Sequence, residues 1–324
     1  MSVLEIPAVL NRIASAEAEG IGLLDDPSLL RDVELCRSWG YPLAFDQGRV
    51  RLARDPDAIV PVWIESETRG IAWGKTRVRG FFEIGSTNDE ALSCARAGAA
   101  EGTLIYAVRQ TAGKGRLGRK WISPAHSGLY FTLILRPHQP LSQWPILTHV
   151  ASVALFESLR DLGKEGIIPN ELAIDLKWPN DILLSGKKTA GILLETALGG
   201  AEAAVVGVGV NIAPESVPVS LSDQATAVGL EAGVPIPRRW LLVRFLKHFQ
   251  NGYRRFSAGR FAEILDDWKR RSTMWNGVEI TVTEGDRIRA AVTCGLSATG
   301  ALKIRTADGN EETVLAGDVS VRRQ

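Results

Sequence analysis

A glycine-rich basic segment, residues 110–121, carries the strongest chemical signal in the sequence, and we call it the basic loop. It reads QTAGKGRLGRKW and sets four cations between two apolar, strand-like segments, namely Lys114, Arg116, Arg119 and Lys120. Glycine permits positive φ and lets backbone amides approach a ligand, and cations this close together repel one another unless a negative group lies among them. The segment therefore predicts an anion-binding site, with a solvated basic turn as the alternative.

Three glycines of the basic loop match the spacing of the G-x-G-x-x-G dinucleotide fingerprint. That fingerprint needs a helix at its third glycine and an acidic residue about twenty positions later. The chain instead continues into an apolar strand candidate, and neither Asp nor Glu occurs between Glu101 and Glu157. A phosphate-binding P-loop is also excluded, because Lys114 is not followed by Ser or Thr. The loop is therefore expected to bind an anion in another way.

Four further segments place polar residues beside predicted strands. GSTNDE at 85–90 begins a helix and offers hydroxyl and amide groups, and KWPND at 177–181 offers a carboxylate and an amide to a magnesium ion or a phosphate. KKTAGILLE at 187–195 sets a cation before a buried strand, and GVGVN at 207–211 allows close approach of a ligand to the backbone. Taken singly, each segment is equally compatible with a helix cap, a turn or a plain strand.

Composition narrows the class of protein. A chain of 324 residues with 45% hydrophobic content can bury cores for two or three domains, and a net charge of +1 gives no global field for nucleic acid or membranes. The three cysteines are far apart and form no C-x-x-C pair, so neither a disulfide framework nor a zinc site is indicated. With no signal peptide and no long apolar span in the sequence, we expect a cytoplasmic protein without a membrane segment.

The elements that must position these residues indicate an α+β fold in three parts. We place the domains at residues 1–65, 66–272 and 273–324. In the first part we expect two helices and a hairpin, near 6–15, 28–39 and 46–48. In the second part we expect strands at 78–84, 104–108, 129–135, 172–177, 191–196 and 203–211, with helices at 86–97 and 144–162. The third part alternates short strands and turns, which suits a small barrel.

The five motifs STN, QTAGKGRLGRKW, KWPND, KKTAGILLE and GVGVN, in this order and at these distances, resemble the biotin protein ligases. The resemblance covers residues 83 to about 215 and continues more weakly through the C-terminal part, which looks like that family's SH3-like domain. It implies a class II synthetase-like catalytic domain of the biotin/lipoate ligase kind, with a mixed sheet and helices. The implied substrates are ATP and biotin, with Mg²⁺ as cofactor. They give biotinyl-5'-AMP, and the biotin then passes to a lysine of a carrier, usually the biotin carboxyl carrier protein of acetyl-CoA carboxylase. A homodimer is also compatible with the resemblance.

The resemblance also implies roles for individual residues. The catalytic residues would be Arg116, Lys188, Lys114 and Arg119. The biotin-binding residues would be Ser86, Thr87, Asn88, Gln110, Lys114, Gly115, Arg116 and Lys188. The ATP-binding residues would be Trp121, Asn180, Asn211 and Arg119, and Asp181 would hold the metal. Lys114 departs from the family, which often has arginine there, and it lacks the two-pronged hydrogen bonding of a guanidinium group.

Residues 1–60 resemble the winged helix-turn-helix by which some family members bind DNA. Ten acidic residues against six arginines give this segment a charge of −4, whereas a DNA-reading domain should be basic. Four acidic residues lie on or just before the helix that would enter the groove, namely Asp25, Asp26, Asp32 and Glu34. We therefore expect no DNA binding. A biotin-sensing regulator and a lipoate ligase are the alternatives, but the GKGRLGR and KWPND segments favour biotin over lipoate.

Overall fold

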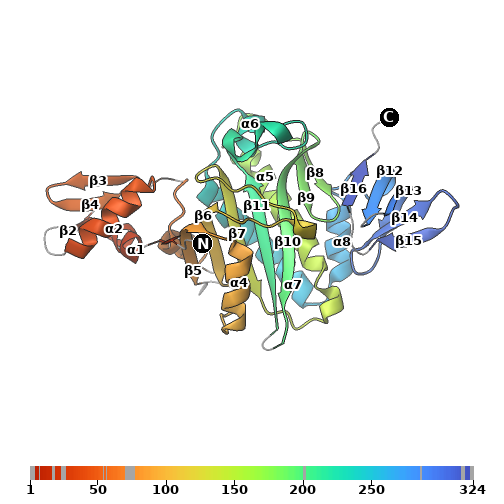
Figure 1. The fold of residues 1–324 in the computed structure, drawn as a ribbon, viewed down its shortest axis with the longest axis horizontal. Coiled ribbons are helices and arrows are strands. Elements are labelled where there is room, and N and C mark those ends of the chain that lie inside the picture. Colours follow the sequence, from red (N-terminus) through yellow and green to blue (C-terminus); the bar gives the residue numbers. More distant parts are fainter. Residues whose placement is uncertain are drawn as a thin grey trace.

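A computed structural model describes residues 4–6, 8–16, 19–22, 27–53, 55, 57–69, 77–199, 202–284, 287–314 and 318–321. Its largest element is an eight-stranded mixed sheet with the order β1-β5-β6-β7-β11-β10-β9-β8 (Figure 1). The strands are β1 (Leu4–Glu5), β5 (Val78–Ile84), β6 (Leu104–Gln110), β7 (Gly128–Leu135), β8 (Ile174–Lys177), β9 (Asp181–Leu184), β10 (Lys187–Ala197) and β11 (Ala203–Asn211). Only β5 and β6 pair in parallel; the other neighbours are antiparallel.

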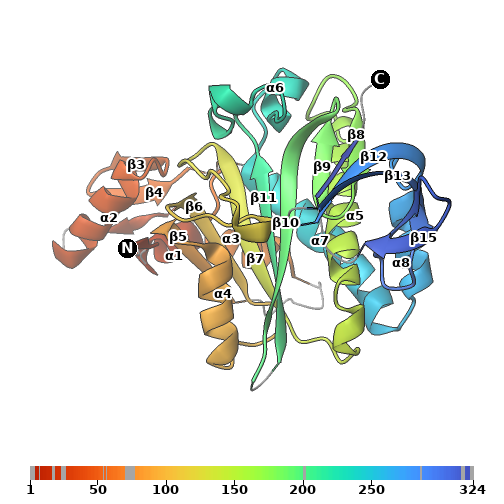
Figure 2. The same ribbon diagram turned by 45° about the vertical axis from the view of Figure 1, so that its right-hand side comes forward.

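Helices cover both faces of this sheet, because alternate residues of each strand point to opposite sides. On β6, Leu104 and Tyr106 belong to the core that includes α5 (Ile146–Lys164), α7 (Arg238–Ser257) and α8 (Phe261–Lys269). The intervening Ile105 and Ala107 pack with α4 (Thr87–Arg96) on the other face. The result is a three-layer arrangement in which α4 lies on one face of the sheet and α5, α7 and α8 lie on the other (Figure 2). A short helix, α6 (Val228–Ala232), follows β11 at one end of the sheet.

The C-terminal part is a separate five-stranded antiparallel sheet with the order β15-β14-β13-β12-β16. Its strands are β12 (Asn276–Glu284), β13 (Arg287–Leu296), β14 (Leu302–Thr306), β15 (Glu311–Val314) and β16 (Asp318–Val321). The loop between β13 and β14 contacts the large sheet's turn at Trp178, whose indole Nε1 donates a hydrogen bond to the Gly300 carbonyl at 3.0 Å. The sequence predicted short strands forming a small SH3-like barrel here, and the five-stranded antiparallel sheet agrees with that fold.

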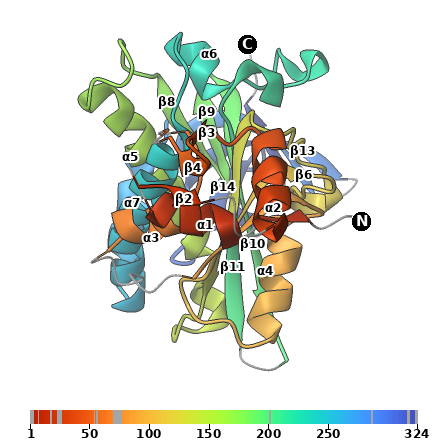
Figure 3. The ribbon, with the colours of Figure 1, turned by 90° about the vertical axis from the view of Figure 1, so that its left-hand side faces the viewer.

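The N-terminal unit, which begins at α1 (Ala8–Ser15) and ends with residue 53, lies at the opposite side of the large sheet from the C-terminal sheet (Figures 1 and 3). It contains α1, β2 (Ile21–Gly22), α2 (Pro27–Ser38), β3 (Leu43–Asp46) and β4 (Arg49–Leu52), and its three-stranded sheet has the order β2-β4-β3. The two helices and the hairpin predicted here are present. Asp25 and Asp26 lie outside the described residues, whereas Asp32 and Glu34 lie on α2. A further helix, α3 (Pro61–Glu67), leads toward β5.

Short segments of the same chain lie at both edges of the large sheet. At one edge β1 pairs with β5, and the Ile6 amide donates to the Gly80 carbonyl at 2.8 Å. At the other edge the Leu176 amide of β8 donates to the Arg271 carbonyl at 3.2 Å, and the Ser272 hydroxyl donates to the Leu176 carbonyl at 2.6 Å. These contacts use backbone groups that an exposed edge would offer to another strand.

The six strands predicted for the central part are all present, and β5 and β11 have the predicted bounds. Strand β8 begins two residues later than expected, and β10 is longer at both ends. Of the predicted domain boundaries, the first falls within α3 and the second between α8 and β12. Within the described part of the chain, the helices lack the length and apolar character needed to cross a membrane.

Candidate active site

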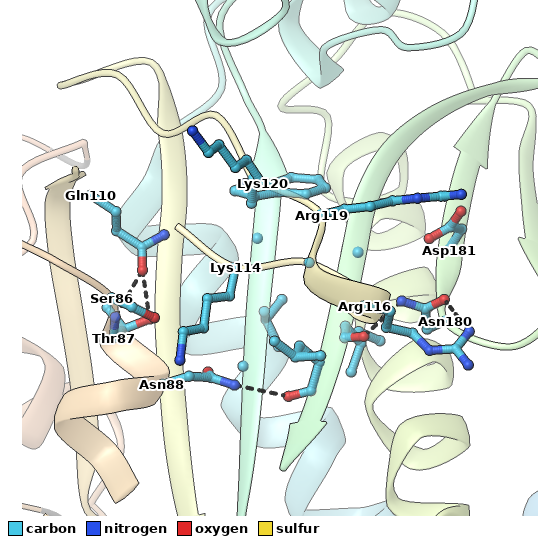
Figure 4. Close-up of a pocket in the computed structure, with 18 of the residues that line it drawn as sticks. Ser86, Thr87, Asn88, Gln110, Lys114, Arg116, Arg119, Lys120, Asn180 and Asp181 are labelled. Carbon is cyan, nitrogen blue, oxygen red and sulfur yellow. Dashed lines mark hydrogen bonds between the residues drawn. The ribbon is translucent and has the colours of Figure 1, made fainter. Parts of the chain in front are cut away.

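A cleft opens on the face of the large sheet that carries α4, next to that helix's N-terminus. Its space amounts to about 760 Å³ including the open mouth. The residues that line it come from β10, β11, the start of α4, the basic loop and the turn before β9 (Figure 4). They are Ser86, Thr87, Asn88, Gln110, Lys114, Gly115, Arg116, Arg119, Lys120, Trp121, Asn180, Asp181, Lys188, Gly191, Ile192, Leu193, Gly207, Val208 and Gly209. Every residue predicted for the site lies here except Asn211.

The N-terminus of α4 is capped from outside the helix. Ser86 occupies the N-cap position, but its side chain makes no capping hydrogen bond. Instead, the Gln110 side-chain carbonyl accepts from the Thr87 amide at 2.8 Å and from the Thr87 hydroxyl at 3.1 Å. The Gln110 amide donates to the Ser123 hydroxyl at 2.9 Å. Two of the predicted biotin-binding residues, Thr87 and Gln110, are thus held by hydrogen bonds at one end of the cleft, where donors and acceptors lie side by side.

Asn88 rests against a glycine of the sheet. Three glycines, Gly207 and Gly209 on β11 and Gly191 on β10, leave this part of the sheet without side chains, and we call it the floor of the cleft. The Asn88 side-chain amide donates to Glu195 Oε2 at 2.8 Å and to the Leu193 carbonyl at 3.3 Å, and its carbonyl oxygen lies 2.7 Å from the Thr132 hydroxyl. Beneath it lies Gly207, where an added Cβ would stand 2.0 Å from the Asn88 carbonyl oxygen. Only glycine therefore allows Asn88 this close to β11.

The basic loop folds back on itself and presses Trp121 onto the same floor. The Gly115 amide donates to the Arg119 carbonyl at 2.7 Å, and Leu117 at the tip has φ of +55° and is 65% exposed. Gly191 and Gly209 are register partners on β10 and β11. An added Cβ at Gly209 would stand 2.6 Å from the Trp121 indole, and one at Gly191 would stand 3.1 Å from it. Two opposed glycines thus form the seat of the indole.

Cations gather at the other end of the cleft. Lys188 Nζ lies 2.6 Å from Asp181 Oδ1 and 5.4 Å from the Trp121 ring centroid. Arg116 donates to the Asn180 side-chain carbonyl at 3.4 Å. Burial lowers the pKa of Arg116, while the Asp181 carboxylate opposes that shift. Such partly dehydrated, positively charged groups are suited to hold a carboxylate and phosphates of like charge together.

Lys114 lies apart from these cations. Its amine forms an ion pair with Asp89 on α4, at the end of the cleft where Asn88 lies (Figure 4). The loop therefore spreads its charges over the length of the cleft.

The described side chains alone do not form a magnesium site. Asp181 is the one carboxylate among the residues lining the cleft, and it is already paired with Lys188. Across the described residues, no group of three or more His, Cys, Asp or Glu side chains is placed to hold a metal ion. Mg²⁺ prefers several oxygen ligands including waters and substrate phosphates, so a lone paired carboxylate fits it poorly.

Asn211 lies outside the lining of the cleft. It is buried at the end of β11, and its side-chain amide donates to the Thr226 carbonyl at 3.2 Å. The sequence analysis missed three residues that hold the lining in place, namely Thr132, Ser123 and Glu195. Of these, Thr132 had a signal: it is the one threonine or serine in the otherwise apolar and aromatic run of β7.

Comparisons with known proteins agree with this geometry. Residues 84–211 match the biotin/lipoate A/B protein ligase family, and residues 277–322 match the biotin protein ligase C-terminal domain. The bifunctional ligase/repressor BirA of Bacillus subtilis is 35% identical over 250 residues, covering 74% of this chain and 73% of its own. The biotin–acetyl-CoA-carboxylase ligase of Paracoccus denitrificans is 33% identical over 232 residues, covering 70% and 93%. A solved biotin protein ligase from Aquifex aeolicus, in complex with biotin and ATP, has a TM-score of 0.62 and 30% identity, covering 76% of this chain and 99% of that one. The chain therefore belongs to the biotin protein ligases, and it is a ligase.

Proposed function

We propose that this ligase activates biotin with ATP and transfers it to a lysine of the biotin carboxyl carrier protein of acetyl-CoA carboxylase. The observation that carries the proposal is the single cleft in which the basic loop, Lys188 and the Asn180–Asp181 turn meet the polar network of Gln110 and Thr87. The structural relative that was solved with biotin and ATP supports the choice of substrates.

In this proposal biotin lies along the floor between the two ends of the cleft. The ureido ring needs both donors and acceptors, which Ser86, Thr87 and Gln110 provide around the start of α4. Asn88, Lys114 and Gly115 line the path from that end. The biotin carboxylate then reaches Lys188, whose ammonium group has three donors and can keep Asp181 while binding the substrate.

ATP takes the end of the cleft nearer β9. Trp121 packs against the adenine and Asn180 contacts the nucleotide, whereas Asn211, buried outside the cleft, has no part in the proposal. Arg116 and Arg119 face the phosphates. A carboxylate oxygen of biotin attacks the α-phosphorus, the bond to the β-phosphate breaks, and pyrophosphate leaves. The cations lower the repulsion between the two anionic reactants, and this is where most of the catalysis should arise.

The second step needs little from the protein. The amine of the carrier lysine attacks the carbonyl carbon of biotinyl-5'-AMP, AMP leaves, and the nitrogen loses a proton to solvent. No protein nucleophile is required, so the role of the cleft in this step is to hold the adenylate until the carrier arrives.

The proposal is tested by weighing the product. Purified protein is mixed with ATP, Mg²⁺, biotin and a biotin carboxyl carrier domain, and the carrier is examined by intact-mass spectrometry, with lipoate and octanoate in parallel. We expect one ATP-dependent biotin adduct, greatly slowed by Arg116→Ala. Arg160→Ala serves as the matched control, because this arginine is half exposed on α5 and pairs with Glu157. Attachment of lipoate or octanoate instead of biotin would refute the assignment.

We also propose that the N-terminal unit is not a DNA-reading head. A helix-turn-helix joins two helices by a short turn, but α1 and α2 are separated by residues 16–26, which include β2. The outer side of α2 exposes Leu30, Glu34 and Leu35 together with Arg31 and Arg37, so it offers phosphates a mixed surface and not a basic one. A mobility shift with biotin-gene promoter fragments should therefore show no sequence-specific retention.

Several contacts fix the N-terminal unit and its connection to the large sheet. Trp39 stacks on Phe82 of β5 with ring centroids 4.6 Å apart. Downstream of the unit, Asp57 accepts hydrogen bonds from the Arg238 amide at 3.0 Å and from its side chain at 2.7 Å. We infer that the unit braces the ligase rather than moving as a separate reader.

A dimer held by pairing of sheet edges is not part of the proposal. Either edge would first have to lose a segment of its own chain, residues 4–6 at β5 or 271–273 at β8. Sedimentation analysis with and without biotin and ATP should therefore give a monomer. A ligand-induced dimer would instead favour the repressor function carried in the names of the Bacillus relatives.

A further inference from the structure

Asp181 lies at the start of β9, where the chain leaves the turn that carries Asn180. Its register partners are Lys177 on β8 and Gly191 on β10. The side chain is 18% exposed and points to Lys188, whose amine lies 2.6 Å from Oδ1. Lys188 is thus confined between this carboxylate and the face of Trp121.

Other cations also act on Asp181. Burial lowers the pKa of Lys177, and the charges of Lys188 and Arg119 lower it further, while Asp181 acts in the opposite direction. Arg116 follows the same pattern, with burial and Arg119 lowering its pKa and Asp181 opposing them. Asp181 is therefore the negative charge about which Lys177, Lys188, Arg116 and Arg119 are arranged.

A divalent metal ion at Asp181 would have to displace the Lys188 amine and enter a neighbourhood of positive charge. The lining offers it no second carboxylate. Magnesium in nucleotide sites is held mainly by waters and substrate phosphates. The charge balance thus opposes a metal ion held by the protein and favours one that arrives on the phosphates of ATP.

We propose that Asp181 is a positioning residue that holds Lys188 in line for the biotin carboxylate, and that it is not a magnesium ligand. The inference rests on the proposed function, because Lys188 matters there as the contact for that carboxylate. Without the Asp181 charge, the neighbouring cations repel the Lys188 amine, whose side chain is already 35% exposed, toward solvent.

The test follows the accessibility of Lys188 in the protein without ATP. An amine-selective acylating reagent is applied briefly, and labelling is quantified by peptide mass spectrometry relative to Lys164, which is 51% exposed on α5. Asp181→Asn should raise the labelling of Lys188 by about fivefold, in line with loss of a partly exposed ion pair. Asp89→Asn is the matched control: it removes the partner of Lys114 and should raise labelling there while leaving Lys188 unchanged.

Magnesium provides the second arm, which needs no variant. Millimolar Mg²⁺ alone should leave Lys188 labelling of the unaltered protein unchanged. A rise with Mg²⁺ alone would show that the metal competes for Asp181 and would overturn the proposal, as would unchanged labelling in a folded Asp181→Asn variant. If that variant does not fold, the Mg²⁺ arm still decides.

A third arm separates this inference from the proposed function. Biotin without ATP should protect Lys188 from the reagent. If biotin gives no protection while the Asp181→Asn and Mg²⁺ results are as expected, the ion pair stands and the biotin contact at Lys188 is refuted.

Discussion

Gly209→Ala tests whether the seat of Trp121 sets nucleotide binding. The new Cβ would stand 2.6 Å from Cε2 and Nε1 of the indole. Carbon atoms pack at about 3.5–4.0 Å, so the ring must move by about 1 Å, away from the strand and into the space proposed for the adenine. The β11 backbone cannot yield easily, because its residues are paired with both β7 and β10.

We expect the displaced aromatic contact to cost about 0.5–1.5 kcal/mol of the free energy of ATP binding, which lowers the affinity for ATP about two- to twelvefold. We expect the KM for ATP to rise by that factor in a pyrophosphate-release assay. The Kd for biotin, measured by calorimetry without ATP, should change by less than about twofold. The indole moves away from the end of the cleft proposed for the ureido ring, and a small displacement there costs little binding free energy.

The matched control is Gly163→Ala on α5. Its nearest heavy atoms lie 3.9 Å from the added Cβ, which is ordinary contact, and alanine favours a helix. It should leave both constants unchanged. The reasoning fails if Gly209→Ala weakens biotin as much as ATP, or if neither constant responds.

Three further predictions concern other parts of the molecule. Thr132→Val removes a fully buried hydroxyl that lies against Asn88 and Thr87. It should weaken biotin binding, measured by calorimetry, and lower the free energy of unfolding by about 1–3 kcal/mol, measured by urea denaturation. Unchanged biotin affinity would contradict a role for this hydrogen-bond network in binding. Burial lowers the pKa of His149 from 6.5 to about 4, so the unfolded chain takes up a proton at higher pH than the native protein does. The free energy of unfolding should therefore fall by about 3 kcal/mol as pH drops from 6.5 to 4, and His149→Leu should remove that share of the pH dependence. Trypsin should cut the basic loop near its exposed tip at Leu117, and biotin and ATP together should slow the cut; equal rates would oppose closure of the loop over the adenylate.

Much of the large sheet could be predicted because its strands carry a local signal. Strand β11 is an apolar run that ends in Asn211, and β5 mixes apolar residues with Arg79 and Glu83 and ends before Gly85, so the bounds of both follow from the sequence. Strand β10 begins with two lysines, so its apolar pattern starts too late; pairing with β9 extends it to Lys187. No bounds were predicted for α7 and α8, although both bury residues at helical spacing, such as Leu242, Phe245 and Phe249 on α7 and Ile264, Leu265 and Trp268 on α8.

The lining of the cleft was largely foreseeable because each motif lies at the start or end of an element, where side chains meet beside the sheet. The residues that hold the lining were not foreseeable, since their roles depend on register. Gly191 opposes Gly209 only because β10 and β11 pair as they do. Asn211 was predicted for the site but lies outside it. Its place in the GVGVN motif does not reveal that its amide donates to the Thr226 carbonyl.

The floor of the cleft can hold its two ends at a fixed distance from each other. Gly207 admits Asn88 from α4, and Gly209, two residues along the same face of β11, admits Trp121 from the basic loop. Both glycines lie in a strand with a full hydrogen-bonded neighbour on each side, so the floor is rigid while the loop above it need not be. The distance between the end assigned to biotin and the end assigned to the nucleotide is therefore set by the backbone of one strand. Specificity is left to the side chains that rest on it, such as Lys114, which keeps the positive charge of the arginine often found in the family but lacks its two-pronged hydrogen bonding.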